Sequence, residues 1–226
     1  MLIGGLQKLT LIDYPGKVAC TLFTYGCNFR CPFCHNASLV TDEPALIPEE
    51  EFFAFLRKRQ GMLDGVGITG GEPLLQKDMV PFLEKIKSLG YAVKLDTNGS
   101  FPERLKEVVS LGLVDLVAMD IKNEPAMYAA TAGTEVSLDA IKESVSYLLS
   151  DAVPYEFRTT MVKGYHTEAS MRGIGEWIRG AKRYFLQNFV DSGHLIGEAE
   201  GLTEEEMRQM LDVVREYIPT AELRGL

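Results

Sequence analysis

Three of the four cysteines stand close together near the start of the chain, at a spacing that suits an iron–sulfur cluster. They are Cys27, Cys31 and Cys34, with three and then two residues between them. Three thiolates on one loop can bind three irons of a [4Fe–4S] cluster and leave the fourth iron with an open position. Such an iron can bind a small molecule and do chemistry on it. The remaining cysteine, Cys20, lies in an apolar run and is expected in the core.

Clustered cysteines also occur at zinc sites and in redox pairs, and the spacing leaves both alternatives open. A zinc site needs a fourth ligand, which His166 or His194 would have to supply from far along the chain. We expect both histidines at the surface. A redox C-x2-C pair would leave Cys27 without a role. The spacing therefore favours the open cluster over zinc.

Three later segments place polar residues at the ends of apolar runs. Residues 70–73 are GGEP, residues 96–99 are DTNG and residues 119–122 are MDIK. A glycine pair lets a backbone approach a ligand closely, although an ordinary turn also uses one. Carboxylates at neighbouring strand ends would be buried side by side, which is costly unless they are paired or bind a metal. Arg158, a charge within an apolar run, is expected to pair with Asp120 or to reach a ligand.

Six strand–helix units in succession position these segments. The predicted strands are 18–24, 65–69, 92–96, 115–120, 155–161 and 183–189. The predicted helices are 49–59, 78–89, 103–111, 138–149, 168–180 and 203–217. This alternation predicts an α/β fold with parallel strands, either a doubly wound sheet or a partial barrel with fewer than the usual eight units. We see no domain boundary, so residues 1–226 are expected to form a single domain.

The composition predicts an ordinary globular protein of the cytoplasm. The 226 residues include 32 acidic and 23 basic side chains, for a net charge of -9. Nucleic-acid-binding domains usually have a basic excess, so no nucleic-acid partner is expected; Lys85, Lys87 and Lys94 are placed on solvated helix faces. No apolar run approaches the ~20 residues of a membrane span, and no signal peptide is recognised. We therefore expect no membrane association.

The cysteine segment and its surroundings resemble a known superfamily. C-x3-C-x2-C after the first strand, with an aromatic residue before the last cysteine, is similar to the signature of radical S-adenosylmethionine (SAM) enzymes. The wider segment YGCNFRCPFCHN resembles the glycyl-radical-enzyme activases. With the lead-in LIDYPGK at 11–17, it looks most like activating proteins of anaerobic ribonucleoside-triphosphate reductase. The resemblance covers nearly the whole chain and implies a partial (β/α)6 barrel of parallel strands.

The resemblance also implies a mechanism. The open iron would bind SAM through its amino and carboxylate groups, and reductive cleavage would give methionine and a 5′-deoxyadenosyl radical. In activases this radical removes a hydrogen from a glycine of a partner, here a glycyl radical enzyme such as anaerobic ribonucleotide reductase. Since no cysteine follows Cys34, the chain holds at most one cluster. An external donor such as flavodoxin or ferredoxin must then supply the electrons.

Site residues follow from the same resemblance. Besides the three cluster cysteines, it implies cofactor contacts by Phe33, Asn36, Gly70, Gly71, Glu72, Asp120, Lys122 and Arg158. It implies a monovalent cation held by Asp96, Thr97, Met119 and Asp120. Alternatively, Asp96 caps a turn and Asp120 forms an ion pair with Lys122. One departure from the family lies in the sixth strand, where Gln187 or Asn188 replaces a ribose-contacting histidine.

Two other functions remain as alternatives. One is a radical SAM enzyme acting on a small molecule, such as a nucleoside precursor. It would be favoured by a polar pocket lined by two long segments, 123–136 and 190–202, both predicted as loops. The other is a non-catalytic zinc or iron–sulfur module that carries electrons or binds a partner.

Overall fold

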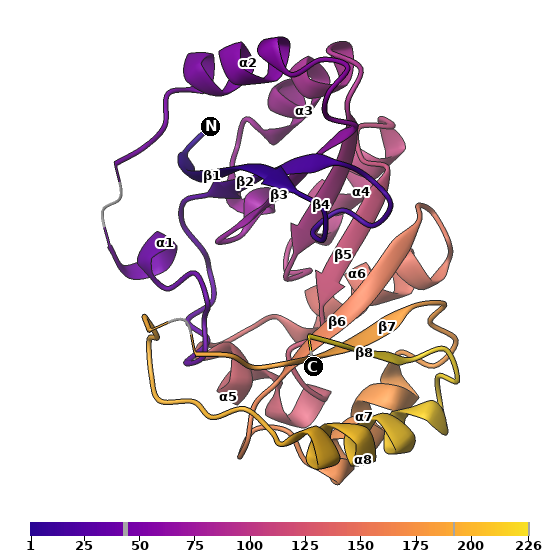
Figure 1. Ribbon diagram of the computed structural model, residues 1–226. Helices are drawn as coiled ribbons and strands as arrows, with labels where there is room; N and C mark the ends of the chain where they lie inside the picture. The colour runs from indigo at the N-terminus through magenta and orange to yellow at the C-terminus, as the bar shows by residue number, and fades with distance from the viewer. Residues whose placement is uncertain (43–44, 192, 226) are drawn as a thin grey trace.

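One curved sheet of eight strands, arranged in chain order, forms the centre of the molecule (Figure 1). The structure is a computed structural model that describes residues 1–42, 45–191 and 193–225. The strands are β1 (Ile3–Thr10), β2 (Ala19–Thr24), β3 (Gly65–Gly70), β4 (Ala92–Thr97), β5 (Leu116–Asp120), β6 (Tyr155–Met161), β7 (Tyr184–Asn188) and β8 (Glu222–Arg224). β1 is antiparallel to β2, and every later pair is parallel.

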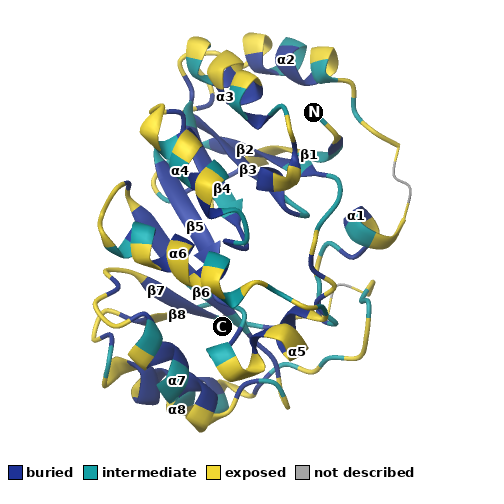
Figure 2. Ribbon diagram, turned by 180° about the vertical axis from the view of Figure 1, so that it is seen from behind, coloured by how far each residue is buried: buried dark blue, intermediate teal, exposed yellow. Residues whose placement is uncertain are grey.

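Helices connect the parallel strands and cover the outer face of the sheet (Figure 1). The longer helices are α2 (Glu49–Lys58), α3 (Met79–Ser88), α4 (Pro102–Ser110), α6 (Leu138–Leu149), α7 (Glu168–Trp177) and α8 (Glu204–Arg215). The shorter ones are α1 (Ser38–Thr41), α5 (Tyr128–Ala132) and the 3₁₀ turns η1 (Pro73–Leu75) and η2 (Pro125–Met127). Figure 2 shows the longer helices exposed outward and buried toward the sheet, the amphipathic arrangement expected of such helices. None of the described helices has the length and apolarity to cross a membrane.

The two faces of the sheet differ in chemistry because successive side chains of a strand point to opposite sides. The face toward the helices is apolar, with fully buried side chains such as Ile68, Leu95, Val117, Phe157 and Leu186. On four of these strands the next residue lines the pocket on the concave side and is polar: Thr69, Asp96, Arg158 and Gln187. On β5 the polar residue on that side is Asp120. The fold therefore buries one face as core and gathers polar groups on the other.

All six predicted strand–helix units are present, with ends that differ by a few residues from the predicted ones. The sequence did not predict the two edge strands, β1 and β8. β1 contains two glycines and is largely half-buried or exposed, and β8 has only three residues, so neither shows a clear strand pattern. The prediction of a plain loop over 123–136 was wrong, because this segment contains η2 and α5.

Candidate active site

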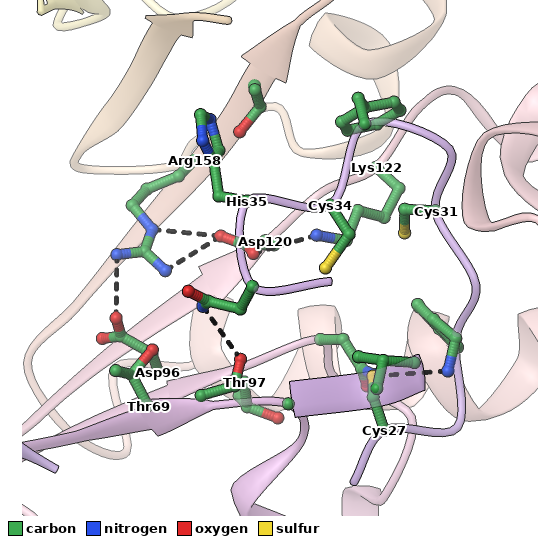
Figure 3. Close-up of a pocket in the computed structure, with 18 of the residues that line it drawn as sticks. Cys27, Cys31, Cys34, His35, Thr69, Asp96, Thr97, Asp120, Lys122 and Arg158 are labelled. Carbon is green, nitrogen blue, oxygen red and sulfur yellow. Dashed lines mark hydrogen bonds and ion pairs between the residues drawn. The ribbon is translucent and has the colours of Figure 1, made fainter. Parts of the chain in front are cut away.

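A pocket opens at the carboxyl ends of the parallel strands and is bounded by the loop after β2 (Figure 3). The strands and the turns after them contribute Thr69, Gly70, Gly71, Asp96, Thr97, Asn98, Asp120, Lys122, Arg158, Thr160 and Gln187. The loop and its continuation contribute Cys27, Phe29, Cys31, Phe33, Cys34, His35, Asn36 and Val40. The pocket has a cavity volume of about 210 Å³ and is open to solvent on one side. This edge of the sheet is where β/α barrel enzymes place their active sites.

The cysteine loop is held by backbone contacts from distant segments. Arg30 N–H donates to the carbonyl of Ala132 at the end of α5, at 2.8 Å. The next residue, Gly133, has φ +68°, and a Cβ there would lie 2.0 Å from the Arg30 carbonyl oxygen. On the other side, Gly197 N–H donates to the Pro32 carbonyl at 2.8 Å. Packing against two later parts of the chain thus fixes the loop.

The three predicted cluster cysteines all line the pocket, and none forms a disulfide. Cys31 is buried, whereas Cys27 and Cys34 are partly exposed. Burial raises the pKa of the Cys27 thiol to about 12 and also raises the pKa of Cys31. Iron would have to displace these protons, because thiolate is the ligand form. The nearby Lys122 ammonium lowers this cost for both thiols by favouring their anions.

The GGEP segment packs against the chain that leads into the cysteine loop. Gly71 N–H donates to the Thr24 carbonyl and Glu72 N–H to the Gly26 carbonyl, both at 2.9 Å. A Cβ on Gly70 would lie 2.2 Å from the Thr24 nitrogen, and one on Gly71 would lie 2.0 Å from the Gly26 oxygen. Both glycines are therefore required by a close backbone approach within the protein, and they also line the pocket.

The carboxylate of Glu72 is fully buried and bonded within the protein rather than turned into the pocket. It accepts hydrogen bonds from Thr97 Oγ1 at 2.8 Å, Asn98 N–H at 2.7 Å and Leu74 N–H at 3.0 Å. Burial raises the pKa of Glu72 to about 7, although these three donors act in the opposite direction. This side chain ties GGEP to DTNG, and Glu72 is not among the residues that line the pocket.

Four charged groups form a network on the pocket side of the sheet (Figure 3). Arg158 donates to Asp96 Oδ2 at 3.1 Å and to Asp120 Oδ1 at 2.9 Å, while Lys122 donates to Asp120 Oδ2 at 3.0 Å. Burial alone would raise the pKa values of Asp96 and Asp120, but the neighbouring cations outweigh it and lower both. The predicted pairings of Asp120 with Lys122 and with Arg158 are confirmed.

Lys94 corrects one prediction from the sequence. It lies on β4, within the predicted strand 92–96 and not on a helix, and it is 2% exposed rather than solvated. Its ammonium pairs with Asp96 Oδ1. Asp96 is therefore held between two cations, and Thr97 and Asn98 cap the DTNG turn by accepting from Gly99 N–H and Ser100 N–H.

Of the other residues predicted to contact the cofactor or a cation, Phe33 and Asn36 line the pocket and Met119 does not. Phe33 is buried in the pocket wall and packs edge-to-face on Tyr165, with ring centroids 5.7 Å apart. Asn36 donates to the Gly70 carbonyl at 3.2 Å, which joins the end of the cysteine loop to GGEP. Met119 is fully buried, and its side chain packs against Gly99 rather than lining the pocket.

Several pocket residues were not predicted from the sequence. They are Phe29, His35, Val40, Thr69, Asn98 and Thr160. Both threonines could have been found from the sequence. Thr69 directly precedes the GGEP segment, and Thr160 lies two residues after Arg158, on the same face of β6. Of the two substitutes for a histidine on the last strand, Gln187 lines the pocket, whereas Asn188 is bonded to the backbone of Leu202.

His166 corrects a second prediction, since it is 3% exposed rather than at the surface. Its ring nitrogens contact backbone groups of Val162 and Lys122. It is therefore not turned toward the cysteines, as a fourth zinc ligand would have to be.

Together, the fold and the pocket define an α/β partial barrel that places three cysteine side chains and a network of charged side chains around one pocket at its strand ends. The profile of the Radical SAM superfamily matches residues 21–178, which is more than half of the chain. The chain therefore belongs to the Radical SAM superfamily and is a radical SAM enzyme. Membership implies a [4Fe–4S] cluster and SAM as cofactors, and the three thiols beside Lys122 fit the cluster.

Individual relatives differ in their named activities. The chain is 31% identical over 236 aligned residues to "Putative glycyl-radical enzyme activating enzyme MJ1227" of Methanocaldococcus jannaschii. The alignment covers 100% of this chain and 96% of the relative. It is 29% identical over 210 residues to a 7-carboxy-7-deazaguanine synthase of Koribacter versatilis, with 89% and 88% covered. A radical SAM methyltransferase structure from Sphaerobacter thermophilus has a TM-score of 0.72 at 14% identity, covering 96% of this chain and 68% of that one. This last likeness confirms the predicted fold.

Proposed function

We propose that the protein is a glycyl-radical-enzyme activase, and that its partner is an anaerobic ribonucleoside-triphosphate reductase. The relative from Methanocaldococcus jannaschii, similar over the full chain, supports the activase assignment. The LIDYPGK and YGCNFRCPFCHN segments favour the reductase as partner through their resemblance to its activating proteins. An external flavodoxin or ferredoxin would supply the electron, since no cysteine follows Cys34.

The observation that carries the proposal is the way the pocket is bounded. Among the described residues, none from 123–136 or 190–202 lines the pocket, so the two long segments after β5 and β7 do not close over it. These segments pack instead against the back of the cysteine loop, through Ala132 and Gly197. A pocket left open at the strand ends suits a large partner that inserts its own loop.

We assign the residues of the pocket to the cofactors as follows. Cys27, Cys31 and Cys34 hold the cluster, which supplies the electron that cleaves SAM. Lys122 and Arg158 bind the cofactor carboxylate, since their ammonium and guanidinium groups are the cations at the pocket wall. Asp120 orients both cations by accepting from each.

The neutral parts of the cofactor are assigned to the other walls. The GGEP backbone at Gly70 and Gly71 faces the amino group, with Asn36 holding Gly70 in place and the buried Glu72 carboxylate holding the segment against DTNG. Phe33 packs against the adenine. Gln187 takes the ribose contact, because it lines the pocket where Asn188 does not. The monovalent cation at Asp96, Thr97, Met119 and Asp120 stays a prediction.

A second candidate is a radical SAM enzyme acting on a small purine-like substrate. The relative from Koribacter versatilis, named a 7-carboxy-7-deazaguanine synthase, is similar over 89% of this chain. Such an enzyme would bind its substrate within the pocket without a protein partner.

One experiment separates the two candidates. The reconstituted, reduced protein is given SAM and either anaerobic ribonucleotide reductase or a panel of purine-like metabolites, with Cys31→Ala as the control. The activase proposal expects a glycyl radical signal in the electron paramagnetic resonance (EPR) spectrum of the reductase and none with Cys31→Ala. Cofactor turnover that needs a metabolite, without a radical on the reductase, would replace it with the second candidate.

A further inference from the structure

His166 stands in the loop between β6 and α7 and joins two parts of the site that are far apart in sequence. Its Nδ1 accepts from the backbone N–H of Val162 at 3.0 Å. An N–H group can only donate, so Nδ1 carries no proton in this arrangement and Nε2 does. Nε2 then donates to the carbonyl of Lys122 at 2.9 Å. The neutral ring therefore links the backbone at the start of the β6–α7 loop to the backbone of Lys122.

The contact between His166 and Lys122 lies just beyond the last ladder pair between β5 and β6. The β5–β6 ladder ends with Asp120 paired to Arg158 and the Ile121 N–H bonded to the Arg158 carbonyl at 2.8 Å. Lys122 is the next residue, and its ammonium faces the pocket and Asp120. A lysine side chain is long and flexible, so the place of its ammonium depends on how firmly its backbone is held.

The residues next to this contact extend it to the cysteine loop. The buried amide of Asn123 donates to the Tyr165 carbonyl and to Thr131 Oγ1, both at 2.9 Å. The Tyr165 ring packs on Phe33, which directly precedes Cys34. The same loop that holds Lys122 thus also supports the wall of the cluster site.

We propose that His166 is a positioning residue of the cofactor site. It fixes the backbone of Lys122 so that the ammonium meets the carboxylate of SAM at the cluster. The inference rests on the proposed contact of Lys122 with the cofactor and requires no particular partner or substrate.

The test compares two amides that imitate different nitrogens of the ring. His166→Gln can place a donor near Nε2 and keep the contact to Lys122, whereas His166→Asn reaches Val162 but not Lys122. Each cluster-loaded variant is titrated with SAM, and the EPR spectrum of the reduced cluster is recorded with and without SAM. Tyr91→Phe is the stability control, since it removes a buried hydrogen bond that Tyr91, just before β4, donates to the Leu56 carbonyl of α2 at 2.6 Å.

We expect the dissociation constant of SAM to rise about tenfold in His166→Asn, the effect of one buried hydrogen bond, with a weaker spectral change on binding. It should stay within about threefold of the original protein in His166→Gln and Tyr91→Phe. Equal SAM binding by the Gln and Asn variants would overturn the proposal, and so would a loss in Tyr91→Phe as large as that in His166→Asn. Because the readout is SAM binding, absence of a glycyl radical on any partner would leave this result standing.

Discussion

At the scale of single residues, most charges on the pocket side of the sheet are balanced by a direct partner. Asp96 and Asp120 share Arg158, and each also has its own lysine. Glu72 differs, because among the described residues its carboxylate contacts three neutral donors and no cation. A buried carboxylate without a cation keeps its proton to a higher pH.

Glu72 should therefore make stability depend on pH. Its pKa is about 7 in the folded protein against an ordinary 4.5, so the folded state binds the proton more tightly. Its contribution is fully present below about pH 4.5 and is lost as the pH rises through 7, by up to about 3 kcal/mol. Thermal unfolding from pH 5 to 8 should show a steeper decline in the original protein than in Glu72→Gln, which cannot titrate. Parallel curves for the two proteins would contradict this assignment.

Residues at strand ends could be predicted from the sequence, whereas residues that support them could not. Asp120 and Arg158 follow or interrupt apolar runs, so a parallel sheet brings them to one edge. His166 gave no such signal, because its burial depends on the Lys122 carbonyl, which only the folded chain brings near. Lys94 interrupts a predicted strand as Arg158 does, but its pairing with Asp96 was not predicted from that position. Burial of a polar residue is a property of its neighbours in space.

At the scale of elements, the short helix α5 and Gly133, the residue that follows it, support the cysteine loop. Amphipathic periodicity revealed the long helices, but α5 has five residues, too few to show a period. Its function depends on where it ends. The Ala132 carbonyl accepts from Arg30 N–H, and Gly133 leaves room for the Arg30 carbonyl.

Gly133→Ala should therefore displace the cysteine loop. A methyl group there meets the Arg30 carbonyl oxygen at 2.0 Å and has to displace that backbone. Gly112→Ala is the matched control, because Gly112, in the turn after α4, also has a positive φ, +67°, but its Cβ would meet nothing within 4 Å. Both variants should lose about 1 kcal/mol from the left-handed backbone. Only Gly133→Ala should also bind less iron and sulfide per chain after reconstitution; equal cluster content in both would exclude a supporting role for α5.

At the scale of the whole molecule, β8 is joined to the sheet by an ion pair between a partly exposed arginine and a fully buried glutamate. Glu156 lies two residues before Arg158 on β6 and is 0% exposed. Arg224 of β8 binds it with both terminal nitrogens, at 2.9 and 3.2 Å, and stacks 3.6 Å from the centre of the Phe185 ring. Three strands, β6 to β8, are thus connected across the sheet below the cofactor network.

Arg224→Met should cost about 3 kcal/mol of unfolding free energy, because it leaves the Glu156 carboxylate buried without its main partner. Arg158 lies close enough to interact with Glu156, which keeps the loss at the lower end of the range for broken buried pairs. The double variant Glu156→Gln/Arg224→Met should recover most of the loss, since a neutral amide is far less costly to bury than an unpaired charge. Urea unfolding of the original protein, of the single variants Glu156→Gln and Arg224→Met, and of the double variant gives the coupling energy. A loss below about 1 kcal/mol in Arg224→Met would mean that β8 is held by its backbone ladder alone, as surface pairs contribute no more than this.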